Sequence, residues 1–205
     1  MAPKNKTRKK RNKKIYFHDH PEFTPNLTPK EIFAMGSFGG TYWRPIKSKF
    51  FKNTLRKRHE RYPAHWWSKL PDNWLFTPFN KYDKSINKYG VKVGTTLQFW
   101  ESKGWMKKSH PYGWIDWYCD FYHGKRSSDD ERQIKRWKGI AGTNGRFMKH
   151  LVTLILKKTP KNKDPRKIKD WNNPEISPKI RQTLQHWGYK LTKQDFVKEV
   201  LSRKK

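Results

Sequence analysis

The sequence predicts a mainly α-helical fold: a small domain with an aromatic core, an extended N-terminal strap and basic tails. Trp, Tyr and Phe make up 16% of the 205 residues, and each ring residue can bury roughly 150–250 Å². Leu, Ile, Val and Phe together supply less than a fifth of the chain, a share that in a highly charged chain is typical of disorder. From residue 95 onward, however, apolar residues recur at helical spacing between capping residues and glycines.

The first 27 residues (1–27) are expected to form a basic disordered arm followed by an extended strap. Residues 1–14 hold eight Lys and Arg, no acid and no apolar residue after Pro3, so they should order only on a partner. The same composition fits a nuclear-localisation signal or a solubilising tail. In the strap, prolines oppose regular structure, and the rings of Tyr16, Phe17 and Phe23 can anchor it.

Residues 28–158 are expected to form the aromatic-rich helical domain. Its first helix should begin at Thr28, because Thr28 and Glu31 have the spacing of a capping box and Pro29 suits the first helical position. The glycine-rich stretch 36–45 then allows a tight turn or a close approach of two backbones. This stretch matches neither a phosphate-binding loop nor a dinucleotide-binding fingerprint.

Four more helices are expected in this domain, over residues 95–103, 111–123, 128–142 and 144–158. In the first of these, Thr95 is the expected cap, and Phe99 and Trp100 are expected to be buried. The second repeats Trp, Tyr and Phe at a spacing of three and four residues. The third should begin with a capping box formed by Ser128 and Glu131.

Residues 159–205 are expected to form a basic linker followed by a two-helix appendage. The linker is rich in Pro, Lys and Asn, which is typical of surface segments. The first appended helix should follow Ser177 and bury Ile180, Leu184 and Trp187 on one face. A second helix should lead to the basic C-terminus.

The charge pattern indicates a polyanionic partner. Lys and Arg number 48 against 17 Asp and Glu, which gives a net charge of +31 and a pI near 10.3, and solubility alone does not explain so large an excess. Because Lys outnumbers Arg by 35 to 13, and Arg makes the commonest specific contact to guanine, we expect phosphate neutralisation rather than base reading. The expected partner is DNA or RNA, bound non-specifically.

The strongest candidate for phosphate binding is one face of the third helix. Arg132, Lys135 and Arg136 lie close together there, and guanidinium forks match phosphate oxygens. The alternative is a solvated face on which Arg132 and Lys135 pair with nearby acids such as Glu131. Aromatic residues interleaved with basic ones can also stack on unpaired bases, although most rings must belong to the core. The candidate nucleic-acid-binding residues are Lys9, Lys10, Arg11, Arg44, Arg56, Arg58, Arg132, Lys135, Arg136, Arg146, Lys157 and Lys158.

No catalytic, metal or cofactor site is expected. Cys119 is the single cysteine, which permits neither an internal disulfide nor a cysteine-based zinc cage and suits a reducing compartment. The run His18-Asp19-His20 cannot enclose a metal by itself. No apolar stretch approaches the ~18 residues of a membrane span, and no apolar segment of a secretory signal follows the basic N-terminus.

An acidic island supplies an enzymatic alternative. Between residues 110 and 131, five acids meet two bases, and Asp116 and Asp120 are four residues apart on one helical face. Two such carboxylates can bind Mg²⁺ in a metal-dependent nuclease. The simpler interpretation is that Asp116 and Asp120 pair with the abundant Lys and Arg, while the acids at 129–131 cap a helix.

Four stretches carry a family likeness: residues 35–45, 62–67, 87–105 and 113–137, the last beginning Gly-Trp-Ile-Asp-Trp-Tyr-Cys. Together they resemble an uncharacterised Trp-rich basic protein family of large DNA viruses of algae and protists, with similar hypothetical proteins in fungi and algae. The resemblance implies a viral or protist origin and brings no catalytic residues. It implies a location in the virion if the chain is viral; otherwise an intracellular location, with the nucleus as one option, is expected.

The leading hypothesis is a non-enzymatic, virion-associated basic protein that binds nucleic acid or another polyanionic surface. Its tails and the basic face of residues 132–170 would make the contacts. The alternative is a minor capsid or scaffold protein whose arm and strap thread between other capsid proteins. Steeply salt-dependent binding to DNA or RNA would distinguish the first from the second.

Overall fold

The computed structural model describes residues 8–11, 14–160 and 163–203. Their regular structure consists of seven α-helices, one two-stranded sheet and several short 3-10 turns, so the prediction of a mainly helical fold with an aromatic core is confirmed. The elements are β1 (Arg8–Arg11), β2 (Lys14–Phe17), α1 (Pro29–Ala34), α2 (Leu97–Ser102), α3 (Trp114–Tyr122), α4 (Asp130–Ile140), α5 (Arg146–Lys157), α6 (Pro178–His186) and α7 (Lys193–Ser202).

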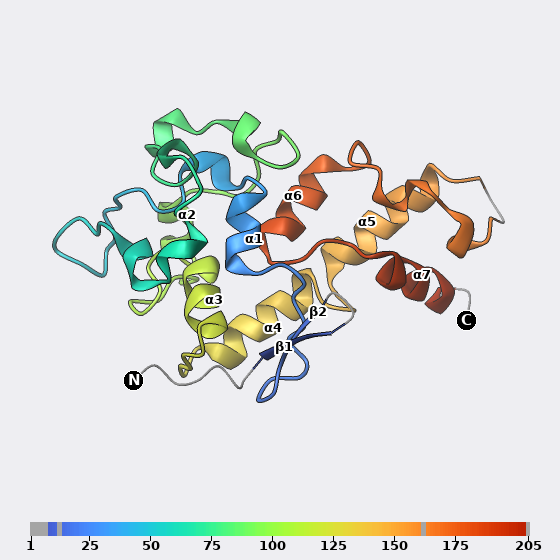
Figure 1. The fold of residues 1–205 in the computed structure, drawn as a ribbon, viewed down its shortest axis with the longest axis horizontal. Helices are drawn as coiled ribbons and strands as arrows, with labels where there is room; N and C mark the ends of the chain where they lie inside the picture. Colours follow the sequence, from blue (N-terminus) through green and yellow to red (C-terminus); the bar gives the residue numbers. More distant parts are fainter. Residues whose placement is uncertain (1–7, 12–13, 161–162, 204–205) are drawn as a thin grey trace.

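Helices α1 and α6 lie near the centre of the molecule (Figure 1). Loops and 3-10 turns between α1 and α2 occupy one side, and α5 and α7 occupy the other. Helix α3 packs against α1 and α4, while α5 packs against α4, α6 and α7. Within the described part of the chain, no helix has the length and apolar character needed to cross a membrane.

The N-terminal arm differs from the expected disordered segment where the structure describes it. Residues 8–11 form β1, which pairs antiparallel with β2. In β2 the buried positions alternate, with Ile15 and Phe17 turned into the core. This burial fixes the backbone of β2 and leaves its edge free to pair with the residues just before it. Residues 1–7 and 12–13 lie outside the described residues, and the expectation for them stays a prediction.

The strap contributes directly to the aromatic core, anchored by rings as its sequence suggests. Phe23 is fully buried, and its ring centroid lies 5.0 Å from that of Trp137 and 5.6 Å from that of Trp117. Phe17 stacks on Phe23 at 5.3 Å and meets Phe121 edge-on at 4.8 Å. Edge-on and offset pairs of this kind are the favoured arrangements of aromatic rings.

The C-terminal segment closes onto the strap. The side-chain amide of Asn26 donates to the Lys190 carbonyl (2.7 Å) and accepts from the Lys190 N–H (2.8 Å). Nearby, Lys14 Nζ lies 2.6 Å from Asp195 Oδ1. The C-terminal segment, expected to be an appendage, therefore shares one core with the rest of the chain. It buries there Ile168, Ile176, Leu184, Tyr189, Leu191, Phe196 and Val200.

Helix α6 buries polar side chains beside Leu184, which is buried as the sequence predicts. Ile180 and Trp187 are only half-buried, whereas Gln182 and Gln185 are buried. Gln185 Nε2 donates to the Ile32 carbonyl (2.7 Å), and Gln182 Nε2 donates to Gln185 Oε1 (2.6 Å). The last carbonyls of a helix have no partner within it, so α6 supplies amide donors to the end of α1.

The helix caps agree with the sequence at α1 and differ at α2. The Thr28 hydroxyl accepts from the Glu31 N–H (3.1 Å), and the Glu31 carboxylate accepts from the Thr28 N–H (2.7 Å), so the capping box is present. Helix α2 is capped by Thr96, whose hydroxyl accepts from the Phe99 N–H (3.2 Å), and not by Thr95.

Helix α4 begins without the expected capping box. Asp129 occupies the N-cap position and makes no side-chain cap bond. Asp130 instead accepts from the indole N–H of Trp117 (2.7 Å) and from the Ser127 hydroxyl (2.8 Å). Asp130, one of the three acids expected to cap this helix, therefore joins the start of α4 to the aromatic helix α3.

The glycines after α1 are required by a close backbone approach, as their sequence allows. Gly36 (φ +87°) and Gly40 (φ +74°) both have left-handed backbone conformations. A Cβ atom on Gly36 would lie 1.9 Å from the Ile86 carbonyl oxygen, and one on Gly40 would lie 1.9 Å from the Asn73 carbonyl oxygen. Only residues without a side chain let the segment around residues 73–86 pack so closely.

Candidate functional site

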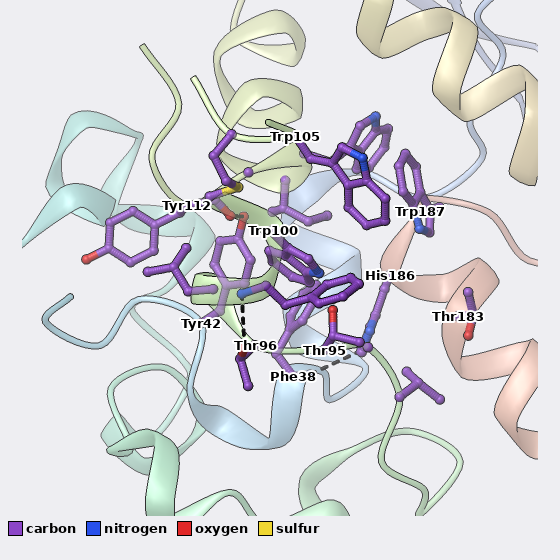
Figure 2. Close-up of a pocket in the computed structure, with 18 of the residues that line it drawn as sticks. Phe38, Tyr42, Thr95, Thr96, Trp100, Trp105, Tyr112, Thr183, His186 and Trp187 are labelled. Atoms are coloured by element: carbon purple, nitrogen blue, oxygen red, sulfur yellow. Dashed lines mark hydrogen bonds between the residues drawn. The ribbon is translucent and has the colours of Figure 1, made fainter. Parts of the chain in front are cut away.

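A large cavity lies where the loops after α1, helix α2 and the C-terminal end of α6 meet the first turns of α3 and α5 (Figure 2). Its volume is about 1070 Å³, at the upper end of the roughly 300–1,000 Å³ typical of small-molecule sites. Figure 2 shows the rings of Trp100, Trp105 and Trp187 around the open space. We call this cavity the aromatic cleft.

The aromatic cleft collects most of the large apolar side chains that the described residues leave exposed. Four such side chains are at least a third exposed: Phe79 (38%), Phe99 (41%), Trp105 (42%) and Leu201 (39%). The first three line the cleft. Exposed apolar groups scattered singly need no explanation, but a cluster of them marks a binding surface.

Phe99 is a correction to the sequence-based expectation, which placed it in the core. In α2 the buried residues are Leu97 and Glu101, and Ser48 donates to the Glu101 carboxylate (2.6 Å). At 100° per residue, a side chain two positions after Leu97 points to the opposite side of the helix. The spacing within this short helix was therefore the signal that could have identified Phe99 as exposed.

The same cleft is strongly basic. Arg44, Lys92, Lys135, Arg136 and Arg146 line it, and none of the described residues in its lining is acidic. A concave site lined by one sign of charge concentrates ligands of the opposite sign. The cleft therefore favours anionic ligands, and its aromatic lining favours those that carry flat rings.

Arg136 is held between two indoles of the cleft. Its guanidinium carbon lies 5.7 Å from the ring centroid of Trp105 and 5.3 Å from that of Trp187, and its Nη1 donates to Gln133 Oε1 (2.9 Å). Burial, together with the nearby charge of Arg132, lowers the pKa of Arg136 to about 10. It remains a cation at neutral pH, and its guanidinium is stabilised by packing on the two ring faces and by the negative charge of Asp129.

A second group of cations rests on the rings of the loop around residue 80. The guanidinium of Arg44 lies 5.0 Å from the Phe79 ring centroid, and its Nη1 donates to the Thr41 carbonyl (2.8 Å). Lys92 Nζ lies 5.5 Å from the Phe79 centroid and 5.0 Å from that of Tyr82. Two separate groups of cations, each packed on aromatic faces, therefore border the cleft.

The wall of the cleft is continuous with the core. The rings of Trp187 and Trp114 lie 4.8 Å apart, and Trp114 stacks on Tyr118 at 5.0 Å. The indole N–H of Trp114 is buried without a hydrogen-bond partner in the described part of the chain. Core packing thus fixes the position of Trp187, one of the two indoles that hold Arg136.

Phe38 forms another part of the lining in a strained conformation. Its φ of 55° lies in the left-handed region, which non-glycine residues rarely adopt. Two contacts hold it there: its N–H donates to His186 Nε2 (3.1 Å), and the two rings stack at 3.8 Å. Backbone strain maintained by surrounding contacts is common at binding sites.

Lowering the pH from 7 to 5 is expected to destabilise the fold by about 2 kcal/mol through His186 alone. Burial lowers the pKa of His186 to about 3, so the folded protein keeps this ring neutral while the unfolded chain protonates it near pH 6.5. The contribution of neutral His186 to the free energy of unfolding is therefore full above pH 6.5 and is lost progressively as the pH falls towards 3. Urea denaturation at both pH values measures it.

The control for this prediction is the exposed His18. His186→Gln should reduce the loss of stability between pH 7 and 5, whereas His18→Gln should leave it unchanged, because His18 is exposed to solvent. An unchanged pH dependence in His186→Gln would show that other groups cause the acid destabilisation.

The structure brings four of the sequence-based candidates together in the aromatic cleft: Arg44, Lys135, Arg136 and Arg146. Arg56, Lys157 and Lys158 are exposed and lie outside its lining. Of Lys9, Lys10 and Arg11, only the backbone in β1 is described. No site role was predicted for Phe79, Lys92, Phe99, Trp105 or Trp187, because their convergence depends on segments far apart in the chain.

Two candidates are bound to carboxylates instead. Arg132 makes a two-point contact with Asp129, with Nε–Oδ1 and Nη2–Oδ2 distances of 2.5 and 2.7 Å. The alternative of an arginine paired with a nearby acid therefore holds for Arg132, although its partner is not Glu131. Arg58 Nε donates to the fully buried carboxylate of Asp116 (3.0 Å), and this ion pair argues against a role for Arg58 in binding phosphate.

The acidic island is occupied by cations of the same chain. Asp116 also accepts from the Tyr62 hydroxyl (2.6 Å). Asp120 lies 2.9 Å from Lys125 Nζ and 3.3 Å from both Arg61 Nη2 and His110 Nε2. Burial alone would raise the pKa of Asp120, but the hydrogen bonds from His110 and Lys125 outweigh it and lower the pKa to about 2. Across the described residues, no three His, Cys, Asp or Glu side chains are grouped to hold a metal ion.

Comparisons with protein-family models, curated proteins and solved structures found no match to this chain. What the cleft can do chemically follows from its residues. It offers flat ring faces for stacking and two groups of cations for phosphate or carboxylate groups.

Proposed function

We propose that this chain binds nucleic acid without catalysis and that the aromatic cleft is its principal contact site. The observation that carries the proposal is the lining of the cleft, which combines five cations, exposed aromatic rings and no acid among the described residues. Phosphates would bind the cations, and bases would pack on the rings. The basic tails and the exposed Lys157 and Lys158 would add phosphate contacts outside the cleft.

Nucleic acid fits these features better than another anion. The +31 charge of the whole chain matches a polymeric polyanion, because each Lys or Arg that meets a phosphate releases a condensed counterion. The excess of Lys over Arg supports phosphate neutralisation without base-specific reading. The likeness to proteins of large DNA viruses supports a place for this binding in the virion.

The alternatives receive less support from the geometry. A capsid scaffold would need the strap to engage other proteins, but its anchors Phe17 and Phe23 lie in this chain's own core. A nuclease would need free carboxylates, but Asp116 and Asp120 are held by arginines and other donors.

Removing two cleft cations is expected to weaken DNA binding about tenfold at 100 mM salt, because two phosphate contacts are lost. The variant is Lys135→Gln with Arg146→Gln, and the measurement is fluorescence anisotropy with a labelled 20-nucleotide strand from 50 to 200 mM salt. The slope of log affinity against log salt should become shallower by about 1.4 for a single strand.

The matched control removes two exposed lysines outside the cleft lining, Lys69 and Lys179, as the double Gln variant. It loses the same charge and should change affinity by less than about threefold, since only long-range attraction is reduced. Equal losses in the two variants would show that charge alone matters and that the cleft is not the site. An unmodified protein that binds no strand even at 50 mM salt would refute the proposed function.

A further inference from the structure

Phe99 and Trp105 form an exposed aromatic corner at the mouth of the cleft. Their rings meet edge-to-face at 85°, with centroids 5.8 Å apart. The corner is fixed by the backbone, because the Trp105 N–H donates to the Trp100 carbonyl (3.0 Å) and Gly104 makes the left-handed turn between them. More than a third of each ring side chain is exposed, so each presents π surface to solvent.

This corner lies directly beside a fixed cation. The guanidinium of Arg136 contacts the Trp105 ring, and the ammonium of Lys103 lies 5.6 Å from the Phe99 ring centroid. A flat group that stacks on either ring would therefore have a positive charge within reach. Alternating flat rings and negative charges are the repeating chemistry of a nucleic-acid strand.

The exposed aromatic side chains of the cleft favour single strands over duplexes as ligands. In a duplex, each base face is covered by its neighbours, so a protein reaches only base edges and phosphates. In a single strand, the bases can turn outward and stack on aromatic side chains. A concave site with rings inside and at its mouth gives its stacking surface only to unpaired bases, while a duplex can touch only the exposed cations.

The two groups of cations indicate that the ligand of the cleft carries more than one phosphate. Arg44 and Lys92 belong to one group, and Lys135, Arg136 and Arg146 line the cleft from α4 and α5. Aromatic residues such as Trp100 and Tyr112 line the cleft as well. A ligand that engages both groups carries at least two negative charges and an aromatic part.

We propose that the aromatic cleft selects single-stranded nucleic acid, with unpaired bases stacked on Phe99 and Trp105 and the flanking phosphates bound by the cleft cations. This inference rests on the proposed function and narrows it to one class of nucleic acid. It separates two contributions: the cations set the salt dependence, and the rings set the preference for unpaired bases.

The test uses three oligonucleotides and the full chain at 100 mM salt. They are a 15-nucleotide thymidine strand, the same strand with most bases replaced by abasic sites, and a 15-base-pair duplex. The thymidine strand is expected to bind at least about tenfold more tightly than either of the others, since base–aromatic stacking of this kind contributes substantially per base. The abasic strand keeps the phosphates, so it isolates the contribution of the bases.

Two ring variants and one control complete the experiment. Phe99→Leu and Trp105→Leu should each weaken binding to the thymidine strand about fivefold or more. Phe99→Leu, whose ring contacts no cation of the cleft lining, should in addition leave the salt slope, the abasic strand and the duplex unchanged. Leu201→Ala, at the remaining exposed apolar position outside the cleft, should change none of these. Thermal unfolding checks that each variant folds, as expected for exposed side chains.

The outcomes separate this inference from the proposed function. Equal affinity for the thymidine strand and the duplex, with no effect of Phe99→Leu or Trp105→Leu, would overturn single-strand selection and leave nucleic-acid binding intact. Salt-dependent binding to none of the three oligonucleotides would overturn the proposed function itself. Unequal affinity that the ring variants do not change would also overturn the inference, because the selectivity would arise outside the corner.

Discussion

Asp116→Ala is expected to lower the free energy of unfolding by about 3–5 kcal/mol. The Asp116 carboxylate is fully buried and accepts from Arg58 Nε (3.0 Å) and the Tyr62 hydroxyl (2.6 Å). Its removal leaves a largely buried guanidinium without a counter-charge and a buried hydroxyl without this acceptor, and both losses are costly. Urea denaturation at pH 7 measures the effect.

The control is an exposed carboxylate that makes only local hydrogen bonds. Asp83 accepts from the N–H and the hydroxyl of Ser85, and Asp83→Ala should cost much less stability than Asp116→Ala, because the lost hydrogen bonds are exposed to water. The double variant Asp116→Ala with Arg58→Ala should be less destabilised than the sum of the two single variants, because it leaves no unpaired charge. Additive losses would show that the two side chains do not act as a pair.

Gly40→Ala is expected to destabilise the protein by at least about 3 kcal/mol, or to prevent folding. Two effects combine at this position. The backbone has φ +74°, which an L-residue adopts at a cost of about 1–2 kcal/mol. In addition, the new Cβ atom would lie 1.9 Å from the Asn73 carbonyl oxygen, and this backbone atom cannot rotate away.

Gly90→Ala separates these two effects. Gly90 also has a left-handed backbone (φ +64°), but a Cβ atom there meets nothing within 4 Å. Its substitution should cost only the conformational part, about 1–2 kcal/mol. The difference between the two variants in thermal or urea unfolding then measures the clash, and equal losses would show that the segment around Asn73 relaxes without cost.

Much of the helical architecture is predictable because its signals are local. The capping box of Thr28 and Glu31, the aromatic repeat of α3 and the positions of α4 to α7 each depend on residues within a few turns of one another. The glycines at 36 and 40 also indicate a close approach before its partner segment is known. These features follow from the geometry of one helix or one turn.

The features that escape prediction depend on distant partners. Helix α6 buries the side chain of Gln185 because its amide donates to the Ile32 carbonyl, about 150 positions earlier in the chain, which also accepts from the Ser37 hydroxyl. The cleft combines Arg44, Phe99 and Arg136 from three separate segments. The basic face expected at 132–136 does not act as one surface. Arg132 forms an ion pair with Asp129, while the guanidinium of Arg136 packs between the indoles of Trp105 and Trp187.

The two hydrogen bonds between Asn26 and Lys190 limit when the core of the chain can fold. This two-bond contact joins residues 164 positions apart, and it can form only after Lys190 has left the ribosome. Until then the strap around Asn26 lacks this partner, and closing so long a loop is entropically costly. Folding of the complete core therefore follows synthesis of the C-terminal segment, and a chain shortened before residue 190 would lack the core residues Leu191, Phe196 and Val200 and leave apolar surface exposed to aggregation.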